Sequence, residues 1–463
     1  MKLIVAFLFI LFYNKSYSQN SWHDVDFGLH GGTGLDMAAD TLNNKLYITG
    51  GVNYAGSNNV FSVQAVGWDG YQYSVVGCST GLDLLNINMP NTIKYINGYI
   101  YAGFTASSGY IMNDCLQTYI GNTKAKYSNG VWDTIGTFWT GEVSSIASFQ
   151  GQPVFAGSNF SIVNSGTTND IANSIALWDG NHWQVLGSNG NNGLVLSNHP
   201  IQDVVIQDMI EFNGELFVSG TFDWAGGITL NNFGIARWNG TTWQEAGTTN
   251  IYKGYFGIYN NELYLANWPG GDIFKWTGTD WVLFAQTDIT PGNALTSILE
   301  YQGKLVVAGH FSSINGVPCN NIAMWDGNQW DDMQGGAKFN PNQPGVGVYS
   351  AAVFQNSLYI GGVFNSVGNN LVVDNIARWG PLTSIPENYK EKKLEIYPNP
   401  ATSTIQIKNN SKNEIVTITD LAGKIIIQSN SSEVDVSLLK DGMYLITSED
   451  VDGRKITGKF VKE

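Results

Sequence analysis

The stretch that decides the fold is FNGELFVSG at residues 212–220, an apolar residue followed by an Asn-Gly turn pair and an alternating strand. The same pattern returns as FQNSLYIGG at residues 354–362, and five further copies run through Leu46, Ile100, Val154, Leu263 and Leu305. Asn-Gly between two apolar runs is typical of a tight hairpin turn. Each copy therefore predicts two antiparallel strands joined by a short turn.

A second motif alternates with the first. Its clearest copy is IALWDGNHW at residues 175–183, with others at 235–243, 273–281 and 322–330 and weaker ones at 68–70, 127–132 and 376–380. Asp-Gly, Asn-Gly and Thr-Gly mark a second hairpin. Its first aromatic recurs at 68, 127, 178, 238, 276, 325 and 379. Two hairpins per period make a four-stranded unit, and such repeats are typical of β-propeller blades.

The two ends of this repeat region complement each other. The seventh copy stops at residues 379–381, WGP, without the strand that follows the turn in the other copies. Residues 21–28, SWHDVDFG, resemble that missing strand as it occurs at residues 242–247, TWQEAG. We expect an all-β fold, with a seven-bladed β-propeller over residues 19–382 closed by the N-terminal strand.

Paired glycines at residues 50–51 and 361–362, followed by aromatic pairs, resemble the kelch and galactose-oxidase-like propeller repeat. Most copies keep one glycine, and the two Trp residues of the motif stand five positions apart. The resemblance implies a fold and no particular activity.

The C-terminal region has a different pattern. It reads LEIYPNPAT at 394–402, TDLAG at 419–423, GMYLI at 442–446 and GKFVK at 458–462. It closely resembles the C-terminal sorting domain (type A) of type IX secretion substrates. That resemblance implies a small immunoglobulin-like β-sandwich over residues 394–463 after a linker at 383–393, with the secretion machinery as partner. The residues that match its motifs are Tyr397, Pro398, Asn399, Pro400, Asp420, Gly423, Gly442 and Tyr444.

The N-terminus predicts the route of export. Lys2 precedes an apolar run from Leu3 to Tyr13, and small residues at Ser16 and Ser18 follow. This is the three-part pattern of a cleaved signal peptide, here residues 1–18. The mature chain has no other segment long enough to span a bilayer. We expect a secreted or cell-surface protein of a Bacteroidetes-type bacterium.

Charge and composition exclude several classes of function. The formal net charge of −15 has the wrong sign for binding nucleic acid or an anionic membrane. The five histidines show no metal-ligand spacing, so we expect no metal and no cofactor. Three cysteines allow one disulfide at most, and the expected topology brings Cys78 near Cys115.

Loop lengths point to one face as the binding surface. Hairpin turns are short, whereas the segments 104–116, 158–173, 221–232, 310–320 and 364–374 are long, as are two connections on the same face, 187–202 and 334–345. Long loops on a rigid scaffold usually carry binding sites. Aromatic side chains there could stack on sugars or could pack between blades. The candidate ligand-binding residues are Phe104, Tyr110, Trp224, Trp268, Phe311 and Phe339.

The leading hypothesis is a monomeric, non-catalytic binding or adhesion protein whose loop face engages glycan or protein. The alternative is a secreted glycan-active hydrolase or lyase with acids near the propeller axis, because two facing carboxylates leave no linear motif. A third interpretation makes the propeller a passive part of an envelope assembly.

Overall fold

The computed structural model divides the chain into two compact units, Met1–Leu382 and Thr383–Glu463. The predicted signal peptide and linker lie outside the described residues. The structure describes residues 20–381 and 395–463 except 33, 51, 53, 62–64, 77–89, 105–110, 114–117, 121–123, 129–130, 137–140, 164–170, 189–190, 198–203, 232–233, 289–293, 339–346, 409–414, 421–423 and 450–454.

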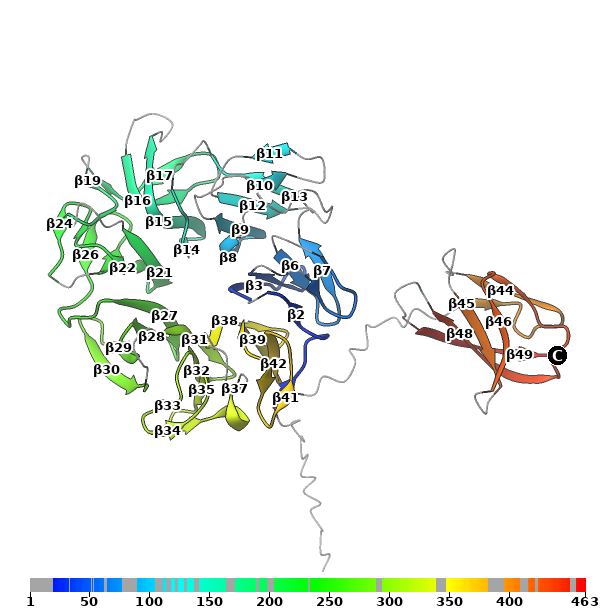
Figure 1. Cartoon of the computed structure of the whole chain (residues 1–463). Coiled ribbons are helices and arrows are strands. Elements are labelled where there is room, and N and C mark those ends of the chain that lie inside the picture. Colours follow the sequence, from blue (N-terminus) through cyan, green and yellow to red (C-terminus); the bar gives the residue numbers. More distant parts are fainter. Residues whose placement is uncertain are drawn as a thin grey trace, which may run out of the picture. The chain divides into compact units, whose positions relative to one another are not determined.

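The described part of the first unit is built on seven four-stranded antiparallel sheets (Figure 1). Sheet 1 consists of β3 (Asp36–Asp40), β4 (Lys45–Thr49), β6 (Ala65–Trp68) and β7 (Tyr73–Val76), and sheet 2 of β8 (Pro90–Ile96), β9 (Tyr99–Phe104), β12 (Lys124–Ser128) and β13 (Val131–Thr134). Sheet 3 consists of β14 (Ser145–Phe149), β15 (Gln152–Val163), β16 (Ile171–Trp178) and β17 (Trp183–Val185). Sheet 4 consists of β21 (Val205–Phe212), β22 (Glu215–Thr221), β25 (Ile235–Trp238) and β26 (Trp243–Glu245).

Sheets 5 and 6 follow the same order from the inside outward. They consist of β27 (Lys253–Tyr259), β28 (Glu262–Trp268), β29 (Asp272–Trp276) and β30 (Trp281–Gln286), and of β31 (Leu295–Tyr301), β32 (Lys304–Gly309), β35 (Ile322–Trp325) and β36 (Trp330–Asp331). Each sheet is made of two successive hairpins, as the alternating motifs predict.

Sheet 7 joins the two ends of this unit. It orders β38 (Gly347–Phe354), β39 (Ser357–Val363), β42 (Ile376–Gly380) and, outermost, β1 (Ser21–His23). Trp22 pairs with Trp379 in the register, their ring centroids lie 5.2 Å apart, and the Trp22 indole N–H donates to the Met333 carbonyl at 2.6 Å. The strand nearest the N-terminus is therefore held by the end of the repeat region.

The innermost strands form a closed cycle of neighbours. Contacts run from β3 to β8, β14, β21, β27, β31 and β38 and back to β3, so the sheets surround an axis in a propeller-like arrangement (Figure 1). Buried apolar clusters occupy the interfaces between successive sheets, including the one between sheets 7 and 1. Exposing an apolar sheet face to water is unfavourable. Packing both faces of a sheet against its two neighbours therefore stabilises it.

The two aromatic residues of the second motif face each other across the outer hairpin. Trp238 and Trp243 are cross-strand partners with ring centroids 5.5 Å apart, and both are buried. Trp276 and Trp281 repeat this at 5.1 Å. These tryptophans pack in the apolar clusters between successive sheets.

Short accessory strands lie in the connections between the main strands. Some pair with another strand of the same connection, and others pair with a strand from the preceding connection. They are β2 (Leu29–His30) with β5 (Tyr54–Ala55), β10 (Ile111–Asn113) with β11 (Thr118–Ile120), β18 (Gly187–Ser188) with β19 (Asn191–Asn192), β20 (Leu194–Val195) with β23 (Trp224–Ala225) and β24 (Ile228–Thr229), β33 (Ser313–Ile314) with β34 (Val317–Pro318), and β37 (Ala337–Lys338) with β40 (Ser366–Val367) and β41 (Leu371–Val372), together with one 3-10 turn, Met333–Gly335.

The second unit is a small two-sheet β-domain. One sheet contains β43 (Glu395–Tyr397), β44 (Thr404–Lys408) and β47 (Glu433–Asp435); the other contains β46 (Ile425–Ser429), β45 (Ile415–Thr419), β48 (Gly442–Glu449) and β49 (Lys455–Lys462). Ile405, Val434, Ile418 and Phe460, two residues from each sheet, belong to one buried cluster. The two sheets therefore share a core.

Candidate functional site

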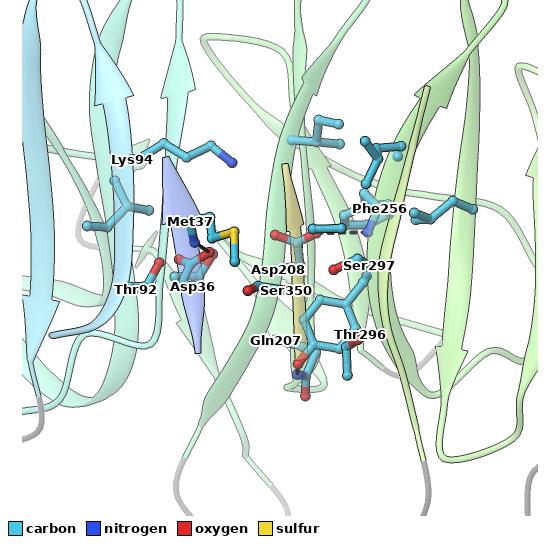
Figure 2. A pocket seen from close by; sticks show the side chains of 18 of the residues that line it. Asp36, Met37, Thr92, Lys94, Gln207, Asp208, Phe256, Thr296, Ser297 and Ser350 are labelled. Atoms are coloured by element: carbon cyan, nitrogen blue, oxygen red, sulfur yellow. Dashed lines mark hydrogen bonds between the residues drawn. The ribbon is translucent and has the colours of Figure 1, made fainter. Parts of the chain in front are cut away.

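A hollow of the described chain lies on the axis of the first unit. Its volume is about 480 Å³, and all seven innermost strands or the residues just before them line it. Asp36, Lys94 and Asp208 project into this axial channel from β3, β8 and β21 (Figure 2). The channel, rather than a loop, brings ionisable side chains together.

One level of the channel carries an oxygen-bearing side chain from every sheet. In six sheets this residue faces the fourth residue of the apolar run in the second strand, for example Asp36 opposite Thr49 and Asp208 opposite Ser219. In sheet 3 the residue is Ser144, which directly precedes β14. We call this set the oxygen ring. Its members are Asp36, Thr92, Ser144, Asp208, Tyr255, Ser297 and Ser350.

The two aspartates of the oxygen ring make matching hydrogen bonds. One carboxylate oxygen of Asp36 accepts the Ile93 N–H of the next sheet at 2.9 Å, and the other accepts the Met37 N–H at 2.8 Å. Asp208 accepts the Phe256 N–H of the next sheet and the Met209 N–H, each at 2.8 Å. Both acids therefore link their own sheet to its successor.

Two serines of the oxygen ring also link their sheet to the next one, but as hydrogen-bond donors rather than acceptors. The Ser144 hydroxyl donates to the Ile206 carbonyl and the Ser350 hydroxyl to the Gly34 carbonyl, both at 2.7 Å. Neither bond places a charge in the channel. Serine and aspartate thus perform the same linking role with different electrostatic consequences.

Burial changes the acidity of both aspartates. Enclosure by the surrounding sheets and, to a smaller extent, the charge of Asp36 raise the pKa of Asp208, the Lys94 ammonium and the N–H donors oppose the shift, and the net pKa is about 6. The pKa of Asp36 is raised in the same way, mainly by burial, and is again opposed by Lys94. Enclosure dominates because a carboxylate in a poorly hydrated site is disfavoured relative to its neutral form.

The candidate aromatic residues occupy different environments. Phe104 and Phe311 are 0% and 4% exposed and belong to the apolar clusters between sheets, so they present no ring to a ligand. Trp224 and Trp268 are half-buried, at the start of β23 and the end of β28. Tyr110 and Phe339 lie outside the described residues.

Trp268 has a cation on its ring. The Lys253 ammonium lies 4.3 Å from the Trp268 ring centroid and 5.6 Å from that of Tyr252. Burial lowers the pKa of Lys253. Such contacts fix the position of both side chains at this end of sheet 5.

Polar side chains fasten the connections between strands, a feature that sequence reasoning missed. The Asn321 amide donates to the Ala337 carbonyl at 2.8 Å, the Asn375 amide to the Leu29 carbonyl at 3.2 Å, and Asp223 accepts the Ser197 N–H at 2.7 Å. The sequence signal was the repeated Asn-Ile-Ala, whose Asn immediately precedes the third strand of sheets 6 and 7.

The remaining chemical expectations concern cysteine and metal. Cys78 and Cys115 lie outside the described residues, so their pairing stays a prediction. Cys319 is a buried thiol whose pKa burial raises to about 12. Across the part of the chain that the structure describes, no group of three or more His, Cys, Asp or Glu side chains could hold a metal ion.

In the second unit, motif residues of the tail hold its last strand in place. Asn399 lies between two cis X-Pro bonds; its amide oxygen accepts the Val461 N–H at 2.9 Å and its amide nitrogen donates to the Lys459 carbonyl at 3.3 Å. The Tyr444 ring stacks on Phe460 with centroids 5.7 Å apart. The YPNP segment therefore fastens β49 from outside the four-stranded sheet.

Other motif residues of the tail shape turns and strand ends. The Asp420 carboxylate accepts the Lys424 N–H at 2.9 Å, and Gly442 begins β48 with a φ of 154°. The Tyr397 hydroxyl donates to the Gln406 side chain at 3.0 Å. Gly423 lies outside the described residues.

Residues 395–463 match the family model of the secretion system C-terminal sorting domain. This match supports export by the type IX secretion system, and the protein is secreted or displayed at the cell surface. Throughout the described residues, no helix has the length and apolar character needed to cross a membrane.

Solved structures of low similarity cover much of the chain. The extracellular domain assigned to the hybrid two-component system BT3049 of B. thetaiotaomicron is 9% identical with a TM-score of 0.48; the match covers 96% of this chain and 57% of that one, so this chain spans little more than half its length. PorZ of Porphyromonas gingivalis, a surface component of the type IX secretion system, is 11% identical with a TM-score of 0.29, covering 96% and 85%.

YCF48 bound to D1 peptide is 15% identical with a TM-score of 0.46, and the match covers 80% of this chain and 97% of that one. At these values none of the three bears on ligand or activity. No curated protein matches the sequence.

Proposed function

We propose that this exported protein is a non-catalytic binding or adhesion module, and that one face of its first unit engages a glycan or a protein. We define the loop face as the end of the ring that carries the connections between second and third strands and between successive sheets. The observation that supports the proposal is the contrast between the two ends. Hairpins fastened by side-chain hydrogen bonds build the loop face, whereas tight turns such as Asn213-Gly214 build the other.

A rigid platform of this kind favours binding because little conformational entropy is lost when a ligand docks. Trp224 lies on an accessory strand between β20 and β24, and Trp268 is held by Lys253. Half-buried tryptophans in fixed orientations are suited to stacking on sugar rings or apolar side chains.

The proposal includes a finer architecture. The first unit is a monomeric seven-bladed propeller of kelch-like type, closed by β1, and the second an immunoglobulin-like sandwich. The cyclic contacts of the innermost strands and the β1–β42 pairing support the first statement, and the two sheets around one core support the second. Residues 1–18 are the proposed signal peptide and Cys78–Cys115 the proposed disulfide.

A glycan array and a surface-binding assay with the mature exported chain test the binding function. We expect binding without release of product, and we expect Trp224→Ala and Trp268→Ala each to weaken it at least tenfold. Tyr99→Ala is the matched control, because Tyr99 is 39% exposed beside the Asn97-Gly98 turn at the opposite end. Equal loss in Tyr99→Ala, or no loss in either Trp variant, would contradict the assignment of the binding face.

The second candidate is a glycan hydrolase or lyase that uses the channel acids. The observation that favours it is the raised pKa of Asp208, near 6, with Asp36 in the same channel. Acid catalysis near neutral pH needs such a value. Against it, both carboxylates hold backbone N–H groups of neighbouring strands. Product release from a polysaccharide, abolished in Asp208→Asn, would establish this candidate in place of the first.

A further inference from the structure

The axial channel offers hydrogen-bonding groups that the protein itself does not use. Among the described residues, the Lys94 ammonium and the Ser297 hydroxyl have no hydrogen-bond or ion-pair partner, and both point toward the lumen (Figure 2). The Tyr255 hydroxyl accepts a bond from the Gln207 amide at 2.5 Å and keeps its own proton to donate, since burial raises its pKa to about 12. Donors are therefore available from three sheets.

Acceptors are available at the same level. Each carboxylate oxygen of Asp36 and Asp208 accepts one backbone N–H, which leaves lone pairs for a second donor. The Ser144 and Ser350 hydroxyls donate to carbonyls and so keep their oxygen lone pairs as well. A ligand at this level meets donors and acceptors on several sides.

The next level of the channel is largely apolar. Two residues along from the oxygen ring, Ile146, Ile210 and Leu299 line the wall, with Lys94 as the charged member. A lining that places oxygen atoms above methyl groups matches a molecule with hydroxyls at its edge and C–H groups on its face. A sugar ring has this distribution of polar and apolar surface.

Charge and size narrow the ligand class. Three acids in the lining, Asp36, Asp208 and Glu300, against one lysine disfavour an anion, and the described residues hold no set of side chains for a metal ion. The volume of about 480 Å³ falls within the roughly 300–1,000 Å³ of small-molecule pockets. We infer that the axial channel binds a small uncharged saccharide of one or two rings, through the oxygen ring and Lys94. This site is independent of the loop-face proposal.

The test is titration of the mature exported chain with N-acetylglucosamine, galactose, mannose, lactose and cellobiose, followed by saturation-transfer NMR and calorimetry. We expect at least one of these sugars to bind at submillimolar to millimolar concentration. Lys94→Met keeps the aliphatic stem and should weaken that binding about tenfold, because it removes a charged hydrogen-bond donor. Ser297→Phe should abolish binding by filling the lumen.

Two controls separate this site from the loop face. Trp224→Ala should leave sugar binding unchanged, and the tryptophan fluorescence of each channel variant should match that of the wild type. If none of the five sugars binds below about 10 mM, or if binding survives both Lys94→Met and Ser297→Phe, the inference is wrong. Loss in Trp224→Ala alone would place the sugar on the loop face instead.

Discussion

Replacing Asp208 by Asn should change how the stability of the first unit depends on pH. Asp208 is ionised at neutral pH inside the channel, and burial raises its pKa to about 6 from 3.8. A raised folded-state pKa means that the unfolded chain ionises more readily than the folded one. The stability that protonated Asp208 contributes is therefore fully present below about pH 3.8 and is lost as the pH rises through about 6.

The magnitude follows from the pKa shift. A rise from 3.8 to about 6 corresponds to about 3 kcal/mol at about 1.4 kcal/mol per pKa unit. Asparagine carries no charge at any pH, but its amide group cannot accept both the Met209 and Phe256 N–H bonds, which costs about 1–3 kcal/mol. That cost is constant with pH. The stability difference between variant and wild type should therefore shift by about 2.4 kcal/mol in favour of the variant between pH 4 and pH 7.5, because part of the total of about 3 kcal/mol is already lost at pH 4.

Urea unfolding followed by tryptophan fluorescence measures this shift. All 15 tryptophans precede residue 382, so the signal reports the first unit alone even in the full exported chain. Asp326→Asn serves as control, because backbone N–H donors in its exposed turn lower the pKa of Asp326. A shift below about 1 kcal/mol for Asp208→Asn, or one equal to that of the control, would refute the assignment of an enclosed carboxylate.

Three further predictions address other parts of the molecule. Trp22→Ala should lower the unfolding free energy in urea by about 3–5 kcal/mol, because it removes a buried indole that joins the two ends of the first unit; a loss below 1 kcal/mol would contradict closure by β1. Lys124→Met should raise the thermal midpoint at pH 7, since burial lowers the pKa of Lys124 to about 5; the gain should shrink toward pH 10, and a pH-independent difference would be inconsistent. Asn399→Ala should speed hydrogen exchange of the Val461 amide about tenfold and reduce the secreted fraction, and unchanged exchange would show that Asn399 does not hold β49.

The sequence contained enough information to predict the hairpins but not the position of every aromatic. Asn-Gly and Asp-Gly turns are local, so their strands follow from short-range chemistry, as in the hairpin around Asn213-Gly214. Phe104 and Phe311 were candidates for stacking on sugars because each lies in a long loop segment, and packing between blades was the alternative. In the structure each turns inward between two sheets, where apolar area is removed from water. Which way a strand-end residue turns depends on the neighbouring sheet, and no local pattern encodes that.

The oxygen ring escaped sequence reasoning for a related reason. Its members lie before or within the innermost strands, and register irregularities shift the pairing by one residue in sheets 2, 4, 6 and 7. Thr92, Asp208, Ser297 and Ser350 become equivalent only when those shifts are counted. An acid near the axis was part of the alternative hypothesis, but its identity required the register.

The use of aspartate in two sheets bears on whether the channel has a function beyond linking sheets. Ser350 and Ser144 join their sheets to the next with neutral hydrogen bonds. Asp36 and Asp208 do the same at the cost of enclosing a charge, as the raised pKa of each shows. A linking role alone favours serine, because it avoids desolvating a carboxylate. A residue that lowers stability by placing a charge where a neutral side chain would serve is more often functional than structural. The carboxylates differ from serine in offering several further acceptor sites to the lumen, and hydroxyl groups of a bound sugar would occupy those sites.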